Sequence, residues 1–372
     1  MEYDQLTFAN YSYRREAPMK TFFTKKRFGA SALTVLAGAT VLALAACSGA
    51  AAPAGSKGGE GSATDAITVY NAQHDTLTQA WVDAFTKETG IKVTVRNGDD
   101  LEMSSQIVAE GAKSPADVFL TENSPAMTQV ETAGLFADIS AKVQEQVPAE
   151  YRPSTNKWAG IAARSTVFAY DKTKLTEAQL PKSIMDLSDA SWKGRWAASP
   201  SGADFQAIVS AMLELKGEDA TLAWLKSMKE NASAIKGNSA AMKAVNAGTI
   251  EGAIIYHYYY FGDQFKTGEN SKNVALHYFK NQDPGAFVSI SGGGVLASSQ
   301  HQASAQKFLE FVTGKAGQTI LQTGTSFEYP VGSGVGANKE LLPLADLQAP
   351  KIDPAKLNSA KVIDLMTQAG LL

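Results

Sequence analysis

The chain has 372 residues, of which 44% are hydrophobic and 19% charged, and its formal net charge is -3. This composition is that of a globular protein of about two domains, and it excludes a disordered chain, a collagen-like chain and a polytopic membrane protein. The weakly acidic charge argues against nucleic acid as a partner, because nucleic-acid binders normally carry a basic face. The single cysteine excludes a disulfide framework, a thiolate zinc site and an iron–sulfur cluster.

Residues 19–46 have the pattern of a secretory signal. A basic cluster that ends at Arg27 precedes an uncharged run rich in Ala, Leu and Val, which continues to Ala46. The sequence Leu44-Ala45-Ala46-Cys47 resembles a bacterial lipobox, so we predict a lipoprotein signal peptide at 19–46 and lipidation of Cys47. The alternative is an uncleaved membrane helix with an incidental cysteine. The short apolar run and its small-residue end favour cleavage.

The segments on either side of this signal have different compositions. Residues 1–18 carry three acidic residues and fit poorly before a signal peptide, so we predict an upstream extension and a start at Met19. Residues 47–65 are mainly Ser, Gly, Ala and Pro, the composition of a flexible tether. We therefore expect a folded region that is lipid-anchored at the extracytoplasmic face of the cell membrane.

From Ala66 onward, strand and helix patterns alternate. Short apolar or alternating segments at 67–70, 91–95 and 117–120 predict strands. Between them, apolar residues at helical spacing predict helices around 77–85 and around 107–108, and Gly90 stands where a C-cap glycine belongs. Strand, helix and strand of these lengths form the βαβ unit of a parallel, doubly wound sheet.

A second set of elements follows. We predict strands at 166–170, 252–255, 287–290 and 295–297, and helices at 203–215, 220–229, 239–247 and around 308–312. Glycines 292–294, between the last two predicted strands, are interpreted as turn glycines. These elements predict an α/β protein of two lobes, and behind a lipid anchor this arrangement resembles the two-lobed periplasmic-binding-protein-like fold of type II. Each lobe is expected to be a doubly wound sheet with helices on both faces, and crossing strands are expected to form the hinge.

The expected N-terminal lobe comprises 66–165 and 288–338, and the C-terminal lobe comprises 166–287 and 339–372. Such lobes bind a ligand outside the carboxyl ends of their strands and close around it by a hinge motion. We expect the protein to be a monomer. The common enzyme signatures are absent: the sequence has no phosphate-binding P-loop, no Gly-x-Ser-x-Gly, no His-Glu-x-x-His and no Cys-x-x-Cys. No catalytic residue is therefore predicted, and the protein is expected not to be an enzyme.

Three groups of polar or aromatic residues directly follow predicted strands. The aromatic run 256–261 follows the apolar strand that ends at Ile255, His74 follows Asn71, and Glu122 follows Thr121. By composition, the aromatic run is also typical of a buried strand or a helix start, and His74 or Glu122 alone is typical of a capping or surface residue. Their common position at strand ends indicates a site in the cleft.

Several sequence blocks resemble the ferric-ion-binding proteins of bacterial ABC-type iron importers, and the similarity runs from about Ala66 to the C-terminus. The blocks are Tyr70-Asn71-Ala72-Gln73-His74, Gly90-Ile91-Lys92-Val93, Pro115-Ala116-Asp117-Val118-Phe119 with Thr121-Glu122, Trp192-Lys193-Gly194, Ser201-Gly202-Ala203, Asn238-Ser239 and Gln282-Asp283-Pro284-Gly285-Ala286. The resemblance implies an extracytoplasmic solute-binding protein. It would capture Fe(III) between two lobes and deliver it to an ABC permease that is powered by a separate ATPase.

In that family one His, one Glu and two consecutive Tyr coordinate Fe(III), with a small anion completing the shell. The resemblance therefore implies His74, Glu122, Tyr258 and Tyr259 as metal ligands, the His/Glu/Tyr/Tyr subclass. The chemistry is sound, since Fe(III) is a hard cation that prefers anionic oxygen ligands. Neighbouring residues on a strand point to opposite faces, so both tyrosines can reach one ion only where the backbone bends, as at a strand-to-helix turn.

The resemblance also implies a synergistic anion, either phosphate, carbonate or citrate. Its expected contacts are Ser201, Gly202, Ala203 and Asn238, because a helix N-terminus offers free backbone N–H groups to an anion. Arg164 is a further candidate, since a guanidinium can grip carbonate with two N–H groups. The sequence departs from the family pattern at Tyr256, where an anion-contacting Asn is common, and at Asp204, which adds negative charge beside the expected anion.

Two alternative functions share either the fold or the iron site of this interpretation. The same fold could bind thiamine, a polyamine, an oxyanion or another metal, with the tyrosines forming an aromatic cage around an organic cation. A surface-anchored non-haem iron enzyme would commonly need two His and one carboxylate around open coordination positions. Only His74 is suitably placed for such a set, which argues against the enzyme.

Overall fold

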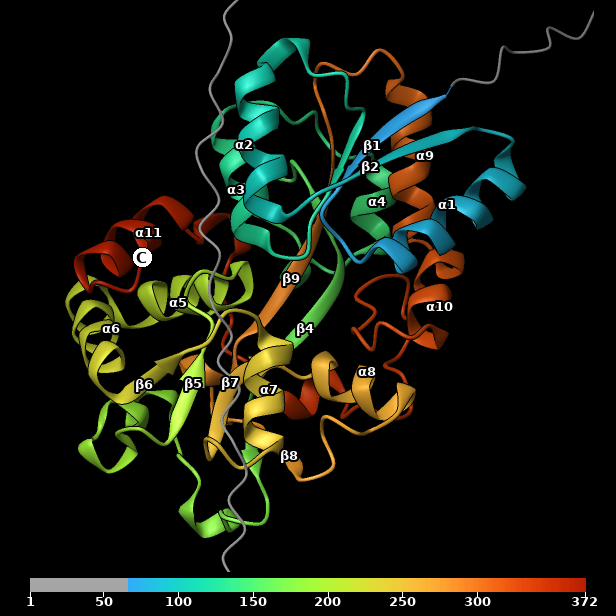
Figure 1. Ribbon diagram of the computed structural model, residues 1–372. Helices are drawn as coiled ribbons and strands as arrows, with labels where there is room; N and C mark the ends of the chain where they lie inside the picture. Colours follow the sequence, from blue (N-terminus) through green and yellow to red (C-terminus); the bar gives the residue numbers. More distant parts are fainter. Residues whose placement is uncertain (1–65) are drawn as a thin grey trace, which may run out of the picture. The chain divides into compact units, whose positions relative to one another are not determined.

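The computed structural model describes residues 66–372 (Figure 1). The predicted upstream extension, signal peptide, lipidated Cys47 and tether lie outside these residues. The strands are β1 (Ile67–Asn71), β2 (Val93–Asn97), β3 (Val118–Leu120), β4 (Ala159–Asp171), β5 (Trp196–Ala198), β6 (Ala232–Ala234), β7 (Gly252–Tyr256), β8 (Val274–His277) and β9 (Val288–Val295). The α-helices are α1 (Asp75–Thr89), α2 (Asp100–Glu110), α3 (Ser124–Thr132), α4 (Ala141–Gln146), α5 (Ala203–Lys216), α6 (Glu218–Asn231), α7 (Asn238–Asn246), α8 (Tyr258–Lys266), α9 (Gln302–Thr313), α10 (Lys315–Thr323) and α11 (Ser359–Gln368).

The first lobe is built on the predicted βαβ unit. Strand β1 pairs in parallel with β2 on one side and with β3 on the other. Helix α1 forms because Leu77, Trp81 and Phe85 recur on one face and are buried there. It ends at Gly90, whose φ of 75° is the left-handed conformation of a C-cap and whose N–H donates to the Thr86 carbonyl. These elements confirm the sequence prediction for this segment.

Strand β4 passes from one lobe into the other. Its residues 159–165 pair antiparallel with β9, and its residues 166–171 pair with β7 and β8. The resulting strand order is β2-β1-β3-β9-β4-β7-β5-β6, with β8 beside β4. Figure 1 shows β4 and β9 running side by side between the two sets of helices. The sequence predicted only 166–170 as strand, because the first half of β4 is rich in alanine and carries a charge at Arg164.

Strand β9 corrects a second prediction. Two strands separated by turn glycines were expected, but 288–295 is one continuous strand that includes Gly292, Gly293 and Gly294. These glycines serve close packing: a Cβ on Gly293 would lie 2.8 Å from Leu309 Cδ1, and one on Gly294 would lie 2.6 Å from Phe136 Cε1. A Cβ on Gly292 would overlap Met127 of α3.

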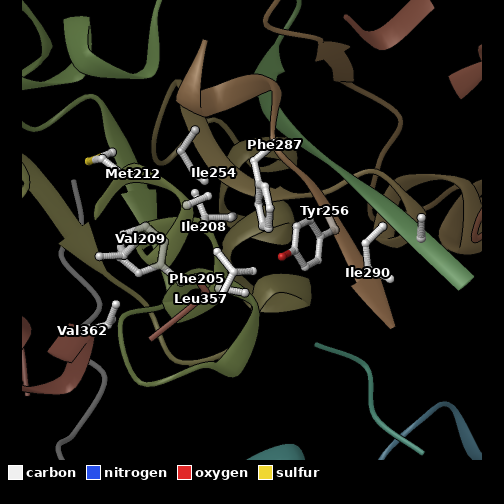
Figure 2. Packing of buried hydrophobic residues seen from close by; sticks show 14 of the residues in the cluster. Phe205, Ile208, Val209, Met212, Ile254, Tyr256, Phe287, Ile290, Leu357 and Val362 are labelled. Atoms are coloured by element: carbon white, nitrogen blue, oxygen red, sulfur yellow. The ribbon is translucent and has the colours of Figure 1, made fainter. Parts of the chain in front are cut away.

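The second lobe places β5 between β6 and β7 in parallel pairing. Figure 2 shows the apolar face of α5, with Phe205, Ile208, Val209 and Met212, gathered with Ile254 of β7 and with Phe287. The C-terminal helix α11 contacts α5 and α6 and adds Val362 to this core. In the part of the chain from 66 onward, no helix combines the length and the apolar character needed to cross a bilayer.

Candidate functional site

His74 and Glu122 meet at the carboxyl ends of two neighbouring parallel strands. His74 follows β1 and stands at the N-terminus of α1, and Glu122 follows β3 just before α3. His74 Nε2 lies 3.0 Å from Glu122 Oε1, and the two side chains are 24% and 23% exposed. The structure therefore brings these two predicted ligands into contact at the edge of the first lobe's sheet.

The two tyrosines arrive from the other lobe. Strand β7 ends at Tyr256, and α8 begins at Tyr258, so the backbone bends between them as the sequence analysis required. The rings of Tyr258 and Tyr259 are stacked with centroids 4.3 Å apart. Tyr258 also meets His74 edge to face, with ring centroids 4.9 Å apart. All four predicted ligands thus belong to one cluster.

Asp204 lies at the centre of the tyrosine side of this cluster. Both phenols donate to its Oδ2, Tyr258 at 3.2 Å and Tyr259 at 3.0 Å. The Asn238 amide donates to the same oxygen at 2.7 Å, and the Asn123 amide donates to Oδ1 at 2.9 Å. Asp204 belongs to the first turn of α5, where the helix dipole favours a negative group.

The segment expected to bind an anion is only partly drawn into this cluster. Asn238 takes part through Asp204, whereas Ser201 is exposed before the start of α5, and Gly202 and Ala203 are partly exposed. From the sequence, Asp204 was recognisable only as a negative charge beside the expected anion. Its position in the first turn of a helix after Ser-Gly-Ala was the signal that could have pointed to its role.

Arg164 and Glu328 form the buried side of the cluster. Both side chains are fully buried, and they pair directly with each other. Arg164 Nη1 also lies 3.4 Å from Glu122 Oε2, and Nη2 donates to Ser291 Oγ at 2.8 Å. The Arg164 guanidinium, which was predicted to bind an anion, is thus already paired with two carboxylates. Sequence reasoning missed Glu328, which is an isolated acidic residue outside every recognised block.

Burial and neighbouring charges set the protonation of the cluster. Burial alone would lower the pKa of His74, but the carboxylates of Glu328 and Glu122 outweigh it and raise the pKa to about 10. Burial, followed by the charge of Asp204, raises the pKa of Tyr258 and of Tyr259 above the ordinary 10.0. At neutral pH His74 is therefore a cation between two carboxylates. Both phenols remain protonated, and each donates a hydrogen bond to Asp204.

The donor set is mixed. Among residues 66–372, no three His, Cys, Asp or Glu side chains are arranged to hold a metal ion by themselves. A metal in this cluster would therefore depend on the phenol oxygens, which become good ligands for a hard cation once they lose their protons.

The remaining histidines are not among the predicted ligands, although the His257 ring lies edge to face with Tyr258, with centroids 6.2 Å apart. His257 is fully buried, and its Nδ1 accepts from the Ser165 backbone N–H at 3.1 Å. His277 ends β8 and contacts the Pro181 carbonyl, and His301 stands before α9. None of the three contacts His74 or Glu122.

Comparisons with known proteins agree on one family. Residues 113–358 match the family described as bacterial extracellular solute-binding protein. The Fe(3+)-binding periplasmic protein of Serratia marcescens is 65% identical over 311 residues, which are 84% of this chain and 92% of that protein. The major ferric iron-binding protein of Neisseria gonorrhoeae is 37% identical over 308 residues, 82% of this chain and 93% of that protein.

Solved structures give the same result. The crystal structure of iron-bound HitA from Pseudomonas aeruginosa superposes with a TM-score of 0.77 and 40% sequence identity, covering 82% of this chain and 100% of that one. The α/β fold with two lobes is therefore confirmed, and so is the expectation of a binding protein rather than an enzyme. With its cluster of His, Glu and Tyr side chains between two strand groups, the chain belongs to the bacterial extracellular solute-binding proteins, among relatives that bind ferric iron.

Proposed function

We propose that the protein binds Fe(III) outside the cytoplasm and supplies it to an importer. The observation that carries the proposal is the meeting of His74 and Glu122 from one lobe with Tyr258 and Tyr259 from the other. The names of relatives with up to 65% identity support iron as the cargo. An aromatic cage for an organic cation would leave the contact between His74 and Glu122 without a purpose.

The proposed ligands are His74 Nε2, a carboxylate oxygen of Glu122 and the two phenolate oxygens. One carboxylate and two phenolates balance the charge of Fe(III), so closure of the lobes does not bury a large uncompensated charge. The cation itself would hold the phenols deprotonated, as a bound metal does for its acidic ligands.

We further propose that Asp204 supplies the negative charge that a synergistic anion would otherwise bring to the site. Its carboxylate already receives Tyr258, Tyr259 and Asn238. The alternative is a bound phosphate, carbonate or citrate at the start of α5, near Ser201, Gly202 and Ala203. Arg164 favours the first arrangement, because its guanidinium is occupied by Glu328 and Glu122.

The cellular setting completes the proposal. Lipidation of Cys47 would tether the binding region to the extracytoplasmic face of the membrane, in reach of an ABC permease and its ATPase. Membership of the solute-binding family supports an importer as the partner. Labelling with a lipid precursor in wild type and in Cys47→Ala tests the anchor, and loss of the label is expected in the variant.

The ligand assignment is tested by Tyr258→Phe and Tyr259→Phe. Each variant should keep the fold, lose tight ferric binding and, when loaded at high iron concentration, show a weaker visible tyrosinate-to-iron charge-transfer band, because one phenolate remains. Tyr260→Phe is the matched control, since it removes a neighbouring phenol of the same helix and should change neither property. Unchanged affinity in both ligand variants, or a colourless iron-saturated wild type, would rule out tyrosinate ligation.

The role of Asp204 is tested by iron loading with and without added anions. Wild type should load equally well in buffer freed of phosphate, carbonate and citrate. Asp204→Asn should bind iron more weakly and should recover when one of these anions is added. A wild type that loads only with an added anion would favour the exogenous-anion alternative.

A further inference from the structure

Glu328 lies directly behind His74, on the side away from Glu122. Its Oε2 is 3.3 Å from His74 Nδ1, and its side chain is fully buried. Its Oε1 is taken by Arg164 and receives the Gln73 amide at 3.3 Å. His74 is thus held between two carboxylates, one at each ring nitrogen. Only Glu122 of these two is a proposed ligand of the ion.

This geometry has a consequence for the imidazole. The charge of a carboxylate beside Nδ1 favours the hydrogen on that nitrogen, which leaves Nε2 as the nitrogen that can face a metal. We propose that Glu328 is the positioning residue of the ferric site and acts through His74. The inference rests on the proposed ferric-ion function, and Glu328 itself does not touch the ion.

The backbone beside Glu328 gives independent support. Phe327 has a φ of 56°, a left-handed conformation that is an outlier for a bulky side chain. Its ring stacks on Phe261 of α8 with centroids 5.9 Å apart, and α8 is the helix that begins with Tyr258. Such strain persists where the surroundings impose it, and it is concentrated at functional sites. The strained residue packs on the tyrosine helix, and the next residue reaches His74.

The competing explanation is that Glu328 only neutralises the buried guanidinium of Arg164. The two roles differ in their dependence on His74. A counter-ion for Arg164 would affect the site equally whether or not His74 is present. A positioning residue loses its effect once His74 is removed.

The experiment is a double-mutant cycle on the full chain, with affinity for Fe(III) measured by chelator competition. Glu328→Gln should weaken iron binding about 10- to 100-fold, the usual effect of losing the partner of a metal-bound histidine. In a His74→Gln background the same change should alter affinity by less than about threefold. Glu251→Gln, which breaks a partly exposed pair with Arg195, is the control and should leave affinity unchanged.

Spectroscopy separates positioning from general damage. Iron-loaded Glu328→Gln should keep the tyrosinate charge-transfer maximum but lose the nitrogen modulation of His74 in pulsed electron paramagnetic resonance. If Glu328→Gln does not fold, Glu328→Asp decides, because it keeps a charge for Arg164 and withdraws it from His74. Equal losses in both His74 backgrounds, or unchanged affinity, overturn the inference. A wild type without iron affinity would instead overturn the proposed function.

Discussion

Three of the proposed ligands hold protons that a bound cation must displace. His74 has a pKa of about 10, and the pKa values of Tyr258 and Tyr259 are raised by burial and by Asp204. All three are therefore protonated at neutral pH in the iron-free arrangement. Ferric binding releases these protons, so acid opposes binding and alkali favours it.

We accordingly expect the apparent affinity for Fe(III) to fall as the pH is lowered from 8 to 6. Each proton released on binding makes the apparent affinity about tenfold weaker for every unit by which the pH is lowered. Chelator competition, corrected for protonation of the chelator, measures the slope of log affinity against pH. His74→Gln should reduce that slope by about one unit, while His301→Gln should not change it. A slope of zero in wild type contradicts the predicted protonation.

His257 is a buried histidine with the opposite shift. Burial lowers its pKa to about 4, below the value of about 6.5 in an unfolded chain. The unfolded state therefore binds the proton more readily between these values. The stability contributed by the neutral ring is complete above pH 6.5 and is lost as the pH falls toward 4.

This shift predicts a pH-dependent difference between wild type and His257→Phe. The free energy of unfolding of wild type should fall relative to that of the variant between pH 7.5 and 4.5, by up to about 3 kcal/mol. Urea unfolding of the iron-free proteins at both pH values measures this change. A difference between the two proteins that does not vary with pH would show that folding does not lower the pKa of His257.

At the scale of elements, the glycines of β9 allow a helix and a sheet to approach closely. Gly292 to Gly294 have no side chains, so Met127 of α3 and Phe136 can pack directly on the strand. The strand in turn carries Ser291, which binds Arg164. Close packing of β9 therefore holds the buried side of the site in place.

We expect Gly292→Ala to destabilise the protein by about 1–3 kcal/mol, because the new methyl group would overlap Met127. Gly262→Ala is the contrasting variant. Gly262 lies inside α8, and a Cβ there would have no heavy atom within 4 Å. It should stabilise the protein by about 0.5–1 kcal/mol. Denaturant unfolding checks both signs, and equal effects of the two changes would contradict the packing argument.

Elements with a clear local sequence signal were predicted correctly, and elements without one were not. Helix α1 and strands β1 to β3 have apolar periodicity and a C-cap glycine, and they lie where the sequence predicted them. The first half of β4 and the glycines of β9 have no such signal, because their strand state depends on pairing with each other. Local patterns do not record partners that are more than 100 residues away.

The residues of the site divide in the same way, into those that the sequence identifies and those that only the fold identifies. Tyr258 and Tyr259 were identifiable because family resemblance marked them and strand order placed them at the cleft. Asp204 and Glu328 were not recognised as members of the cluster. Their importance comes from hydrogen bonds to residues far along the chain, such as Tyr259 and His74, which only the folded structure reveals.

At the scale of the whole molecule, the proposed ligands are divided between the lobes. His74 and Glu122 follow β1 and β3, and Tyr258 and Tyr259 open α8 after β7. A bound ion would therefore join two parts of the protein that otherwise meet along β4, β9 and their neighbours. Binding only to the folded state raises its stability by an amount set by ligand concentration and affinity.

Removal of iron is accordingly expected to lower the Tm. At a free iron level 1,000 times the Kd, the bound ion would contribute about 4 kcal/mol. Calorimetry of the loaded protein, and of the same protein stripped by a chelator, measures the difference. Tyr258→Phe should show a much smaller shift, because the second lobe would hold the ion through Tyr259 alone. An equal shift in wild type and this variant would locate the iron elsewhere.

Strand β4 changes partners at a single point, from β9 at Ser165 to β7 at Thr166. Arg164 comes immediately before this point and is fully buried. If the lobes rotate against each other, the exchange of partners at 165–166 is the natural hinge. Tyr256 pairs with Thr166 at this point, and the Arg164 guanidinium lies 5.4 Å from the centre of the Tyr258 ring, so Arg164 and the start of α8 both lie close to the hinge. A positive charge at the hinge neutralises Glu122 and Glu328 in the open as well as the closed arrangement. Opening of the cleft therefore leaves neither carboxylate without a counter-ion.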